Sequence, residues 1–347
     1  MITLIRWILM PVSVIYGIVV WIRNILYDKG ILKSTKFTIP TIVVGNLAIG
    51  GTGKSPMTEY IIRLLKENYT IATLSRGYGR KTKGYKIVTT ASSALEVGDE
   101  PLQFKNKFPD VTVAVSEDRC FGIRQLKDNH DLILLDDAYQ HRKLTPGFSI
   151  LLFDFNSLFS PIIPLPTGDF RDNISATKRA DLILVTKSPD NILEDQKKHI
   201  EHLIRKHSPA PIFYTGIKYE QPKNRNGENL TVELKGFDII LFCGIANPLP
   251  LKTHLSAIGN TIYTLEFQDH HNYIDKDFKK IEEYYYSLPS TNKILLTTEK
   301  DIQRIPNSAL SNLPLYYIPI SLKSIDQQQN TFDQFIFNYI HSSLPNS

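Results

Sequence analysis

Six consecutive residues near position 50 have the types that bind a phosphate group: Gly50, Gly51, Thr52, Gly53, Lys54 and Ser55. Glycines let successive backbone N–H groups converge on phosphate oxygens, and a helix that begins there adds a partial positive charge. In this arrangement we expect Lys54 to reach the β and γ phosphates of a nucleotide and the Ser55 hydroxyl to ligate Mg²⁺. The strict form of such a loop has glycine where this chain has Ala48. The alternative is therefore a glycine-rich turn with an incidental lysine.

A pair of acids follows an apolar run further along the chain. Asp136 and Asp137 come directly after residues 131–135, where a P-loop protein keeps the carboxylate of its Mg²⁺ site. Adjacent side chains at a strand end point in different directions, so one acid can hold the metal while the other holds a water or a substrate hydroxyl. We assign the metal to Asp136 and the catalytic role to Asp137, although the pattern alone does not separate the two. The alternative is a turn with an N-capping aspartate.

Basic residues gather in two further segments. Residues 76–83 form a basic loop after an apolar run, which suits a phosphate on the substrate or lipid headgroups. Donors also follow the paired acids, in residues 138–143. On these grounds we assign Arg76, Arg80 and His141 to substrate binding or charge stabilisation. Arg119, in the segment 116–119, is another candidate for a charge-stabilising arginine near the predicted cleft. The alternatives are a solvated face and an ordinary polar loop.

The elements that must position these residues are predicted from short apolar runs at 41–44, 70–74, 111–115, 131–135, 149–153 and 181–185. These runs are rich in Ile, Leu and Val, and helix-length segments separate them, a pattern typical of a parallel sheet covered on both faces. The spacing of Met57, Ile61 and Leu65 predicts a helix directly after the phosphate-binding residues. We therefore predict a P-loop NTPase-like α/β domain, with a mostly parallel sheet, over residues 31–219.

The composition becomes polar at residues 220–230, which predicts a linker. Four more apolar runs, at 238–242, 261–265, 293–296 and 315–318, then alternate with helices such as 275–288. This alternation predicts a second, smaller α/β domain over residues 231–347 that completes a cleft.

The first 30 residues form a separate element. Residues 2–21 are mostly apolar and approach the ~20 residues that a spanning helix needs. Arg6 and Pro11 favour a helix in the membrane interface, and no small-residue cleavage site of a signal peptide follows. We predict a membrane-associated helix over residues 1–30. The alternatives are a helix packed on the protein's own core and a helix that crosses the bilayer.

The overall composition excludes several classes of protein. Hydrophobic residues make up 42% and charged residues 22%, as in globular rather than disordered chains. The net charge of +5 does not indicate nucleic-acid binding and suits anionic lipids or phosphorylated small molecules. Cys120 and Cys243 are the two cysteines, so we expect no disulfide framework, no thiolate metal site and a reducing compartment.

Several motifs, in one order, resemble those of the tetraacyldisaccharide 4'-kinase family. In the first half they are VGN at 44–46, GGTGKSP at 50–56, LSRGYGR at 74–80, VGDEP at 97–101 and LDDAYQHR at 135–142. In the second half they are GIANP at 244–248, FQDHH at 267–271 and LTTEKD at 296–301. The resemblance spans nearly the whole chain and is far more specific than a P-loop alone.

The resemblance implies transfer of the ATP γ-phosphate to the 4' hydroxyl of a lipid A disaccharide precursor, at the cytoplasmic face of a bacterial inner membrane. It implies two α/β/α units with a cleft between them, and no obligate protein partner is evident. It also implies that Asp99 and His270 together take the proton of the sugar hydroxyl. We choose His270 over His271 because it directly follows Asp269 in the motif. Arg171, in a segment that matches the family's Pro-Leu-Arg-like segment loosely, is assigned to substrate or charge stabilisation.

A P-loop switch protein or metallochaperone without lipid kinase activity is the alternative function. Members of that group with a deviant loop carry a lysine just before the double glycine, where this chain has Ile49. A guanine-reading aspartate is also missing from residues 184–189, which disfavours a GTPase.

Overall fold

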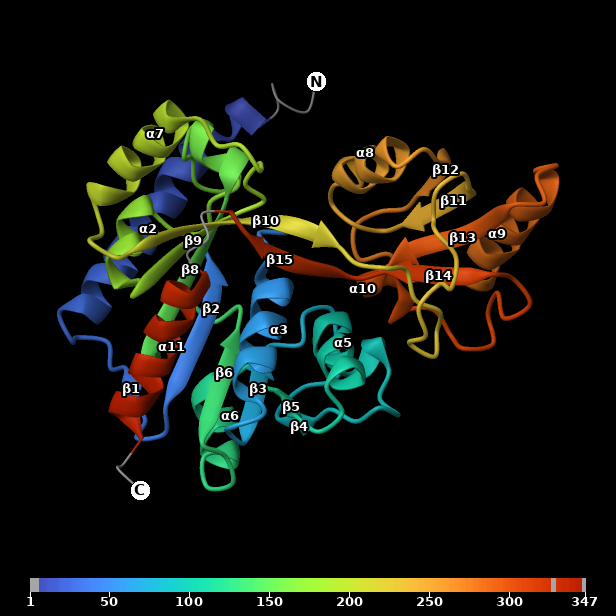
Figure 1. The fold of residues 1–347 in the computed structure, drawn as a ribbon. Coiled ribbons are helices and arrows are strands. Elements are labelled where there is room, and N and C mark those ends of the chain that lie inside the picture. The colour runs from blue at the N-terminus through green and yellow to red at the C-terminus, as the bar shows by residue number, and fades with distance from the viewer. Residues whose placement is uncertain (1–5, 326–328, 345–347) are drawn as a thin grey trace.

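The larger lobe of the molecule is built on a nine-stranded sheet (Figure 1). The computed structural model describes residues 6–325 and 329–344. In sheet order the strands are β15 (Ile320–Ser324), β10 (Ile212–Tyr219), β9 (Leu182–Thr186), β8 (Phe148–Asp154), β2 (Thr41–Asn46), β6 (Leu132–Asp136), β3 (Ile71–Ser75), β5 (Thr112–Val115) and β4 (Lys86–Ile87). The pairs from β10 to β5 are parallel, and the two edge strands are antiparallel. The predicted parallel α/β domain is confirmed.

Helices cover both faces of this sheet because the strands are apolar on both sides. One face packs against α3 (Lys54–Leu65) and α11 (Gln329–Ser343), which bury Ile61 and Ile336. The other face packs against α6 (Arg119–Leu126) and α7 (Glu194–Arg205), which bury Ile123 and Ile200. The short α4 (Ala94–Val97) and α5 (Asp99–Lys107) pack on β5 at the sheet edge.

The smaller lobe contains a four-stranded parallel sheet of order β12-β11-β13-β14 (Figure 1). Its strands are β11 (Asp238–Cys243), β12 (Thr261–Glu266), β13 (Lys293–Thr298) and β14 (Leu315–Ile318), and its helices are α8 (Leu249–Ala257), α9 (Asp275–Ser287) and α10 (Glu299–Ile302). A separate apolar cluster lies on each face of the sheet. The predicted runs at 238–242, 261–265, 293–296 and 315–318 are all strands here.

The chain crosses between the lobes twice, and the two crossings lie side by side. Tyr317 pairs with Lys223, Glu220 N donates to Pro319 O at 2.9 Å, and β15 then pairs antiparallel with β10. The segment from Ile320 therefore returns to the large sheet, and α11 covers that sheet. This differs from the prediction that residues 231–347 form one small domain. The difference arises because β10 and β15 were not recognised as strands.

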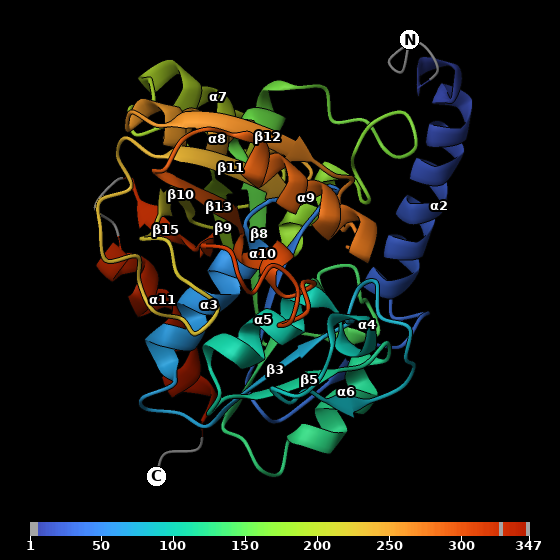
Figure 2. The same ribbon diagram turned by 90° about the vertical axis from the view of Figure 1, so that its right-hand side faces the viewer.

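The N-terminal helix α2 (Met10–Asp28) lies along one edge of the large lobe (Figure 2). It is the one described helix long and apolar enough to cross a membrane, and only 6% of its apolar window is buried. Its exposed side chains include Ile15 (63%), Val19 (58%) and Trp21 (55%). After α2, β1 (Thr35–Lys36) pairs with β7 (Leu144–Thr145). Of the predicted helix, residues 1–5 lie outside the described residues, as do 345–347 of the predicted small domain.

Candidate active site

The phosphate-binding residues lie between β2 and α3, in the middle of the large sheet. Gly50 and Gly53 have φ angles of 99° and 81°, in the left-handed region that glycine adopts without a steric penalty. Asn46 Nδ2 donates to Thr52 Oγ1 at 2.8 Å, and Thr186 Oγ1 donates to Thr52 O at 2.8 Å. The loop is thus fixed to the ends of β2 and β9, and α3 begins at Lys54.

Asp136 lies at the end of β6, next to β2, and it is buried. Burial first, and then the carboxylates of Glu100 and Asp137, raise the pKa of Asp136 to about 7. The described side chain that donates a hydrogen bond to this carboxylate is Thr58, at 3.3 Å. One hydrogen bond does not offset the cost of burying a charged carboxylate, so a cation beside Asp136 would stabilise it. The oxygen donors of Asp136 and Ser55 therefore fit Mg²⁺, which prefers such ligands.

Asp137 is surrounded by cations at the end of β6. Its Oδ1 lies 3.8 Å from Lys54 Nζ and 2.9 Å from Arg171 Nη2, and Arg171 also contacts Asn46 Oδ1. Burial acts to raise the pKa of Asp137, but Lys54 and Arg171 outweigh it and lower the pKa. Asp137 has a φ of 48°, which is uncommon for a residue with a side chain and recurs at functional sites. The carboxylate holds Lys54 and Arg171 beside the phosphate-binding loop.

Asp99 and His270 meet across the two lobes. Asp99 begins α5 after Gly98, whose φ of 93° is in the left-handed region, and His270 follows β12 with a φ of 59°. Asp99 Oδ2 lies 3.2 Å from His270 Nδ1, whereas His271 Nε2 lies 2.8 Å from Asp277 Oδ2. Burial acts to raise the pKa of Asp99, but His270 and two neighbouring cations hold that pKa well below its ordinary value. The geometry thus pairs His270, and not His271, with Asp99.

A chain of contacts joins this pair to the phosphate-binding loop. Ser55 Oγ donates to Glu100 Oε1 at 2.8 Å, and Lys300 Nζ donates to the same oxygen at 3.1 Å. Lys300 Nζ also lies 3.9 Å from Asp99 Oδ2. Because Lys300 belongs to the small lobe, these contacts position both lobes around one centre.

A second contact between the lobes lies behind this centre. Lys107 Nζ lies 2.7 Å from Glu59 Oε2 of the large lobe and 2.7 Å from Glu299 Oε1 of the small lobe. Gln103 Nε2 also donates to Glu59 Oε1 at 2.7 Å. Burial first, and then the Glu59 carboxylate, raise the pKa of Glu299 to about 7.

Three other arginines predicted for the site, Arg119, Arg76 and Arg80, lie in different surroundings. Arg119 is buried and donates to the Asp137 backbone carbonyl at 3.3 Å, and burial lowers its pKa to about 10. Arg76 is exposed, whereas Arg80 contacts Glu117 and the Gly84 carbonyl. The side chain of Arg80 therefore supports its own loop.

His141 lies near Arg119 and lines a hollow with Arg23, Tyr27 and Arg142. Burial first, and then Arg119, lower the pKa of His141 to about 4. Its Nε2 is buried and has no hydrogen-bond partner among the described residues. The ring of His141 is therefore neutral at physiological pH, and its Nε2 is shielded from solvent.

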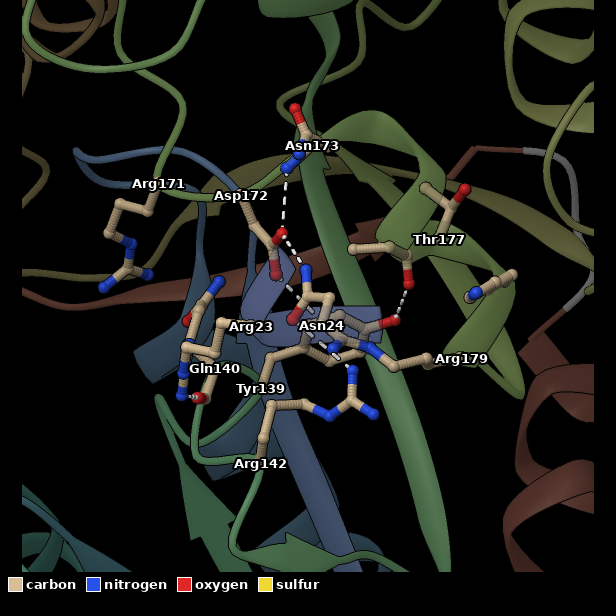
Figure 3. A network of polar contacts seen from close by, with 12 residues as sticks. Arg23, Asn24, Tyr139, Gln140, Arg142, Arg171, Asp172, Asn173, Thr177 and Arg179 are labelled. Carbon is tan, nitrogen blue, oxygen red and sulfur yellow. Dashed lines mark hydrogen bonds and ion pairs between the residues drawn. The ribbon is translucent and has the colours of Figure 1, made fainter. Parts of the chain in front are cut away.

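Helix α2 is fastened directly to the loop that follows the paired acids (Figure 3). Arg23 donates to the Gln140 carbonyl at 2.8 Å, and the Gln140 amide donates in turn to the Asn46 carbonyl at 2.5 Å. Asn24 Nδ2 donates to Asp172 Oδ1 at 2.8 Å, and Arg179 binds the other oxygen of the same carboxylate at 3.1 Å. The polar end of the apolar helix is thus connected to the phosphate-binding loop through Gln140 and Asn46.

Several residues of the site were missed by sequence reasoning. Arg304 contacts the Asp99 carboxylate, and its Nη2 lies 3.0 Å from His270 Nδ1. Glu100 and Lys300 fall inside the quoted motifs without an assigned role. The sequence does contain one indication of Arg304. Asp301 and Arg304 are three residues apart, a spacing that places an acidic and a basic side chain on the same side of a helical turn.

A phosphate-binding loop on a parallel sheet, with paired acids on the next strand and an acid–histidine pair between the two lobes, defines a P-loop kinase. The profile of the family described as "Tetraacyldisaccharide-1-P 4'-kinase" matches residues 5–341. The chain belongs to this family.

Known relatives match over essentially their full length. A protein of Flavobacterium johnsoniae named tetraacyldisaccharide 4'-kinase is 43% identical over 98% of this chain and 99% of its own length. A protein of Bacteroides thetaiotaomicron with the same name is 39% identical over 99% of this chain and 95% of its own. The crystal structure of LpxK from Aquifex aeolicus in complex with ATP is similar, with a TM-score of 0.77, 29% identity and coverage of 97% and 99% of the two chains. The predicted family is confirmed, and the metallochaperone or switch alternative is not favoured.

Proposed function

We propose that this protein transfers the γ-phosphate of ATP to the 4' hydroxyl of a tetraacyl disaccharide 1-phosphate in lipid A biosynthesis. The observation that carries the proposal is the link from Ser55 through Glu100 and Lys300 to Asp99, which ties an acid–base pair to the phosphate-binding loop. A nucleotide-driven switch has no need of a base fixed in this way. The full-length relatives named as kinases of this substrate support the same acceptor.

Positioning and charge stabilisation account for most of the catalysis of phosphoryl transfer. The backbone N–H groups of the loop and the Lys54 ammonium bind the phosphates, and Arg171 adds a second cation close by. Ser55 and Asp136 would hold Mg²⁺, which when bound offsets charge on the phosphate oxygens. Asp137 keeps Lys54 and Arg171 oriented until the nucleotide replaces it as their partner.

The pair of Asp99 and His270 acts on the acceptor. With Nδ1 of His270 directed at Asp99 Oδ2, Nε2 is the nitrogen left to take the proton of the sugar hydroxyl. The Asp99 carboxylate fixes the orientation of the ring. Such assistance is worth about 10² to 10⁴-fold in rate.

Helix α2 brings this site to a lipid surface. Its exposed apolar side chains favour insertion into the interface of the inner membrane, on the cytoplasmic side where ATP is available. An apolar hollow beside α2, lined by Met10, Val14, Ile18 and Pro164, suits an acyl chain of the substrate. Arg76 and His141 are our candidates for contacts to its phosphate.

The test is transfer of labelled γ-phosphate from ATP to a detergent-dispersed tetraacyl disaccharide 1-phosphate. We expect labelled bisphosphorylated lipid from the intact protein and a strong loss with Lys54→Ala and with Asp99→Ala. ATP hydrolysis without label in the lipid would contradict the acceptor and return the switch alternative to first place.

A further inference from the structure

We propose that Arg304 is a positioning residue that keeps His270 unprotonated beside Asp99. The catalytic meaning of this inference rests on the proposed function, because an unprotonated imidazole is what a base requires. The arrangement of charges on which it depends is a property of the folded protein itself.

Arg304 contacts both members of the acid–histidine pair with one nitrogen atom. Its Nη2 binds the Asp99 carboxylate and lies 3.0 Å from His270 Nδ1, while Nδ1 lies 3.2 Å from Asp99 Oδ2. The side chains of Arg304 and Asp99 are each 5% exposed, so water screens this interaction weakly. The three groups therefore form one charged unit.

The guanidinium is held in place by a buried network in the small lobe. Arg304 Nη1 donates to Asp301 Oδ1 at 3.3 Å. Asp301 is itself fixed, because its carboxylate accepts hydrogen bonds from Gly244 N at 3.1 Å and from Thr298 Oγ1 at 2.7 Å. Arg304 thus reaches Asp99 from a preformed support.

A carboxylate beside an imidazole stabilises the imidazolium ion, which has no free nitrogen to accept a proton. With Asp99 alone, His270 would tend to hold a proton as an ion pair. The fixed positive charge of Arg304 offsets the Asp99 charge at the same nitrogen. This favours the neutral ring and keeps Asp99 ionised.

One other group near His270 adds positive charge beside Asp99, and the remaining neighbours do not contact the pair as ions. Lys300, from α10, adds a second cation 3.9 Å from Asp99 Oδ2. From the loop after β3, the Tyr78 ring lies 5.2 Å from the His270 ring and carries no charge. The adjacent Asp269 is exposed to solvent, and His271 is paired with Asp277.

Hydrogen-bonding capacity points the same way. A guanidinium only donates, so Nδ1 of His270 either donates to Asp99 or accepts from Arg304. Either arrangement leaves one ring nitrogen without a proton, and the proposed proton transfer uses the one in which Nδ1 donates to Asp99. Nε2 is then the free nitrogen.

The direct test is an NMR titration of His270 in full-length ¹⁵N-histidine-labelled protein, with the signal assigned by its loss in His270→Gln. In Arg304→Gln we expect the protonation midpoint of His270 to rise by about one pH unit. Arg225→Gln is the matched control, because Arg225 donates to the Ile305 and Ala309 carbonyls of the same segment and does not contact the pair. A midpoint that is unchanged in Arg304→Gln would overturn the proposal.

Arg304→Lys covers the possibility that the glutamine variant does not fold. It keeps the positive charge, so we expect the wild-type midpoint. A midpoint raised in Arg304→Lys would overturn the electrostatic role.

The second readout is the pH dependence of kcat/KM for phosphorylation of the lipid. In Arg304→Gln the acidic limb is expected to move to higher pH by the same amount, with activity recovering above it. An equal loss of rate at every pH would indicate a merely structural role and would overturn the proposal. If no variant, nor the wild type, phosphorylates the lipid, the proposed function fails, and the NMR titration still decides the role of Arg304.

Discussion

The Lys54 ammonium lies 3.8 Å from Asp137 Oδ1, so the cation of the phosphate-binding loop is held by the acid at the end of β6. We expect Lys54→Met to lower kcat/KM by about 10² to 10³-fold, because a preorganised donor to the phosphate oxygens is lost. The fold should persist, since Arg171 still binds Asp137. The measurement is γ-phosphate transfer together with thermal unfolding. Lys252→Met, which removes a half-buried lysine paired with Glu266 in the small lobe, is the control, and equal losses in both variants would contradict the assignment.

Asp99 and His270 should behave as one unit in a double-mutant cycle. We expect Asp99→Asn and His270→Gln each to lower kcat by about 10² to 10⁴-fold. The double variant should lose little more than either single variant, because each change disables the same proton transfer. His271→Gln should have little effect, since His271 binds Asp277 instead. Additive losses would show that the two side chains act separately.

The central strands could be predicted from the sequence because uniform apolar runs mark parallel strands buried on both faces. β10 and β15 could not, because they lie at or near the sheet edge and mix buried with exposed residues. Their pairing also depends on the return of the chain from the small lobe. For this reason the predicted extent of the small domain differs from the structure.

In the candidate site, too, local features could be predicted from the sequence and long-range contacts could not. The phosphate-binding loop and the paired acids could be predicted because their chemistry is local in sequence. The contact of Arg304 with Asp99 joins residues 205 positions apart, and that of Lys107 with Glu299 joins residues 192 apart. No local pattern encodes such pairs. Arg80 shows how a local pattern can mislead. Its basic loop suggested that it binds a ligand, whereas in the structure its side chain contacts Glu117.

Glu299 should make the stability of the protein depend on pH. Burial and the Glu59 carboxylate raise its folded-state pKa to about 7, above its unfolded value. The folded state therefore binds this proton more tightly, and the associated stability is present below the unfolded pKa and lost as pH rises through about 7. We expect Glu299→Gln to raise the unfolding temperature by about 3 °C at pH 8, with little change at pH 4.

Thermal unfolding at both pH values is the measurement for Glu299. The variant leaves no orphaned cation, because Lys107 still pairs with Glu59 at 2.7 Å. Glu266→Gln, at an exposed acid of the same lobe, is the control and should not reproduce the effect. The same shift at pH 4 and pH 8 would sink the electrostatic explanation.

Helix α2 should supply membrane affinity and not chemistry. Replacing Ile15, Val19 and Trp21 with serine removes three exposed apolar side chains, and burial of one such side chain is worth about 1.5 to 3 kcal/mol. We expect binding to vesicles of anionic phospholipid to weaken by more than about tenfold, while ATP binding and the unfolding temperature stay unchanged. Serine at three exposed positions of α9, namely Lys279, Glu283 and Tyr286, is the matched control. Undiminished vesicle binding by the α2 variant would refute the anchor. Because Arg23 joins α2 to the loop that carries Gln140, we also expect the helix to set how far the site stands from the bilayer surface.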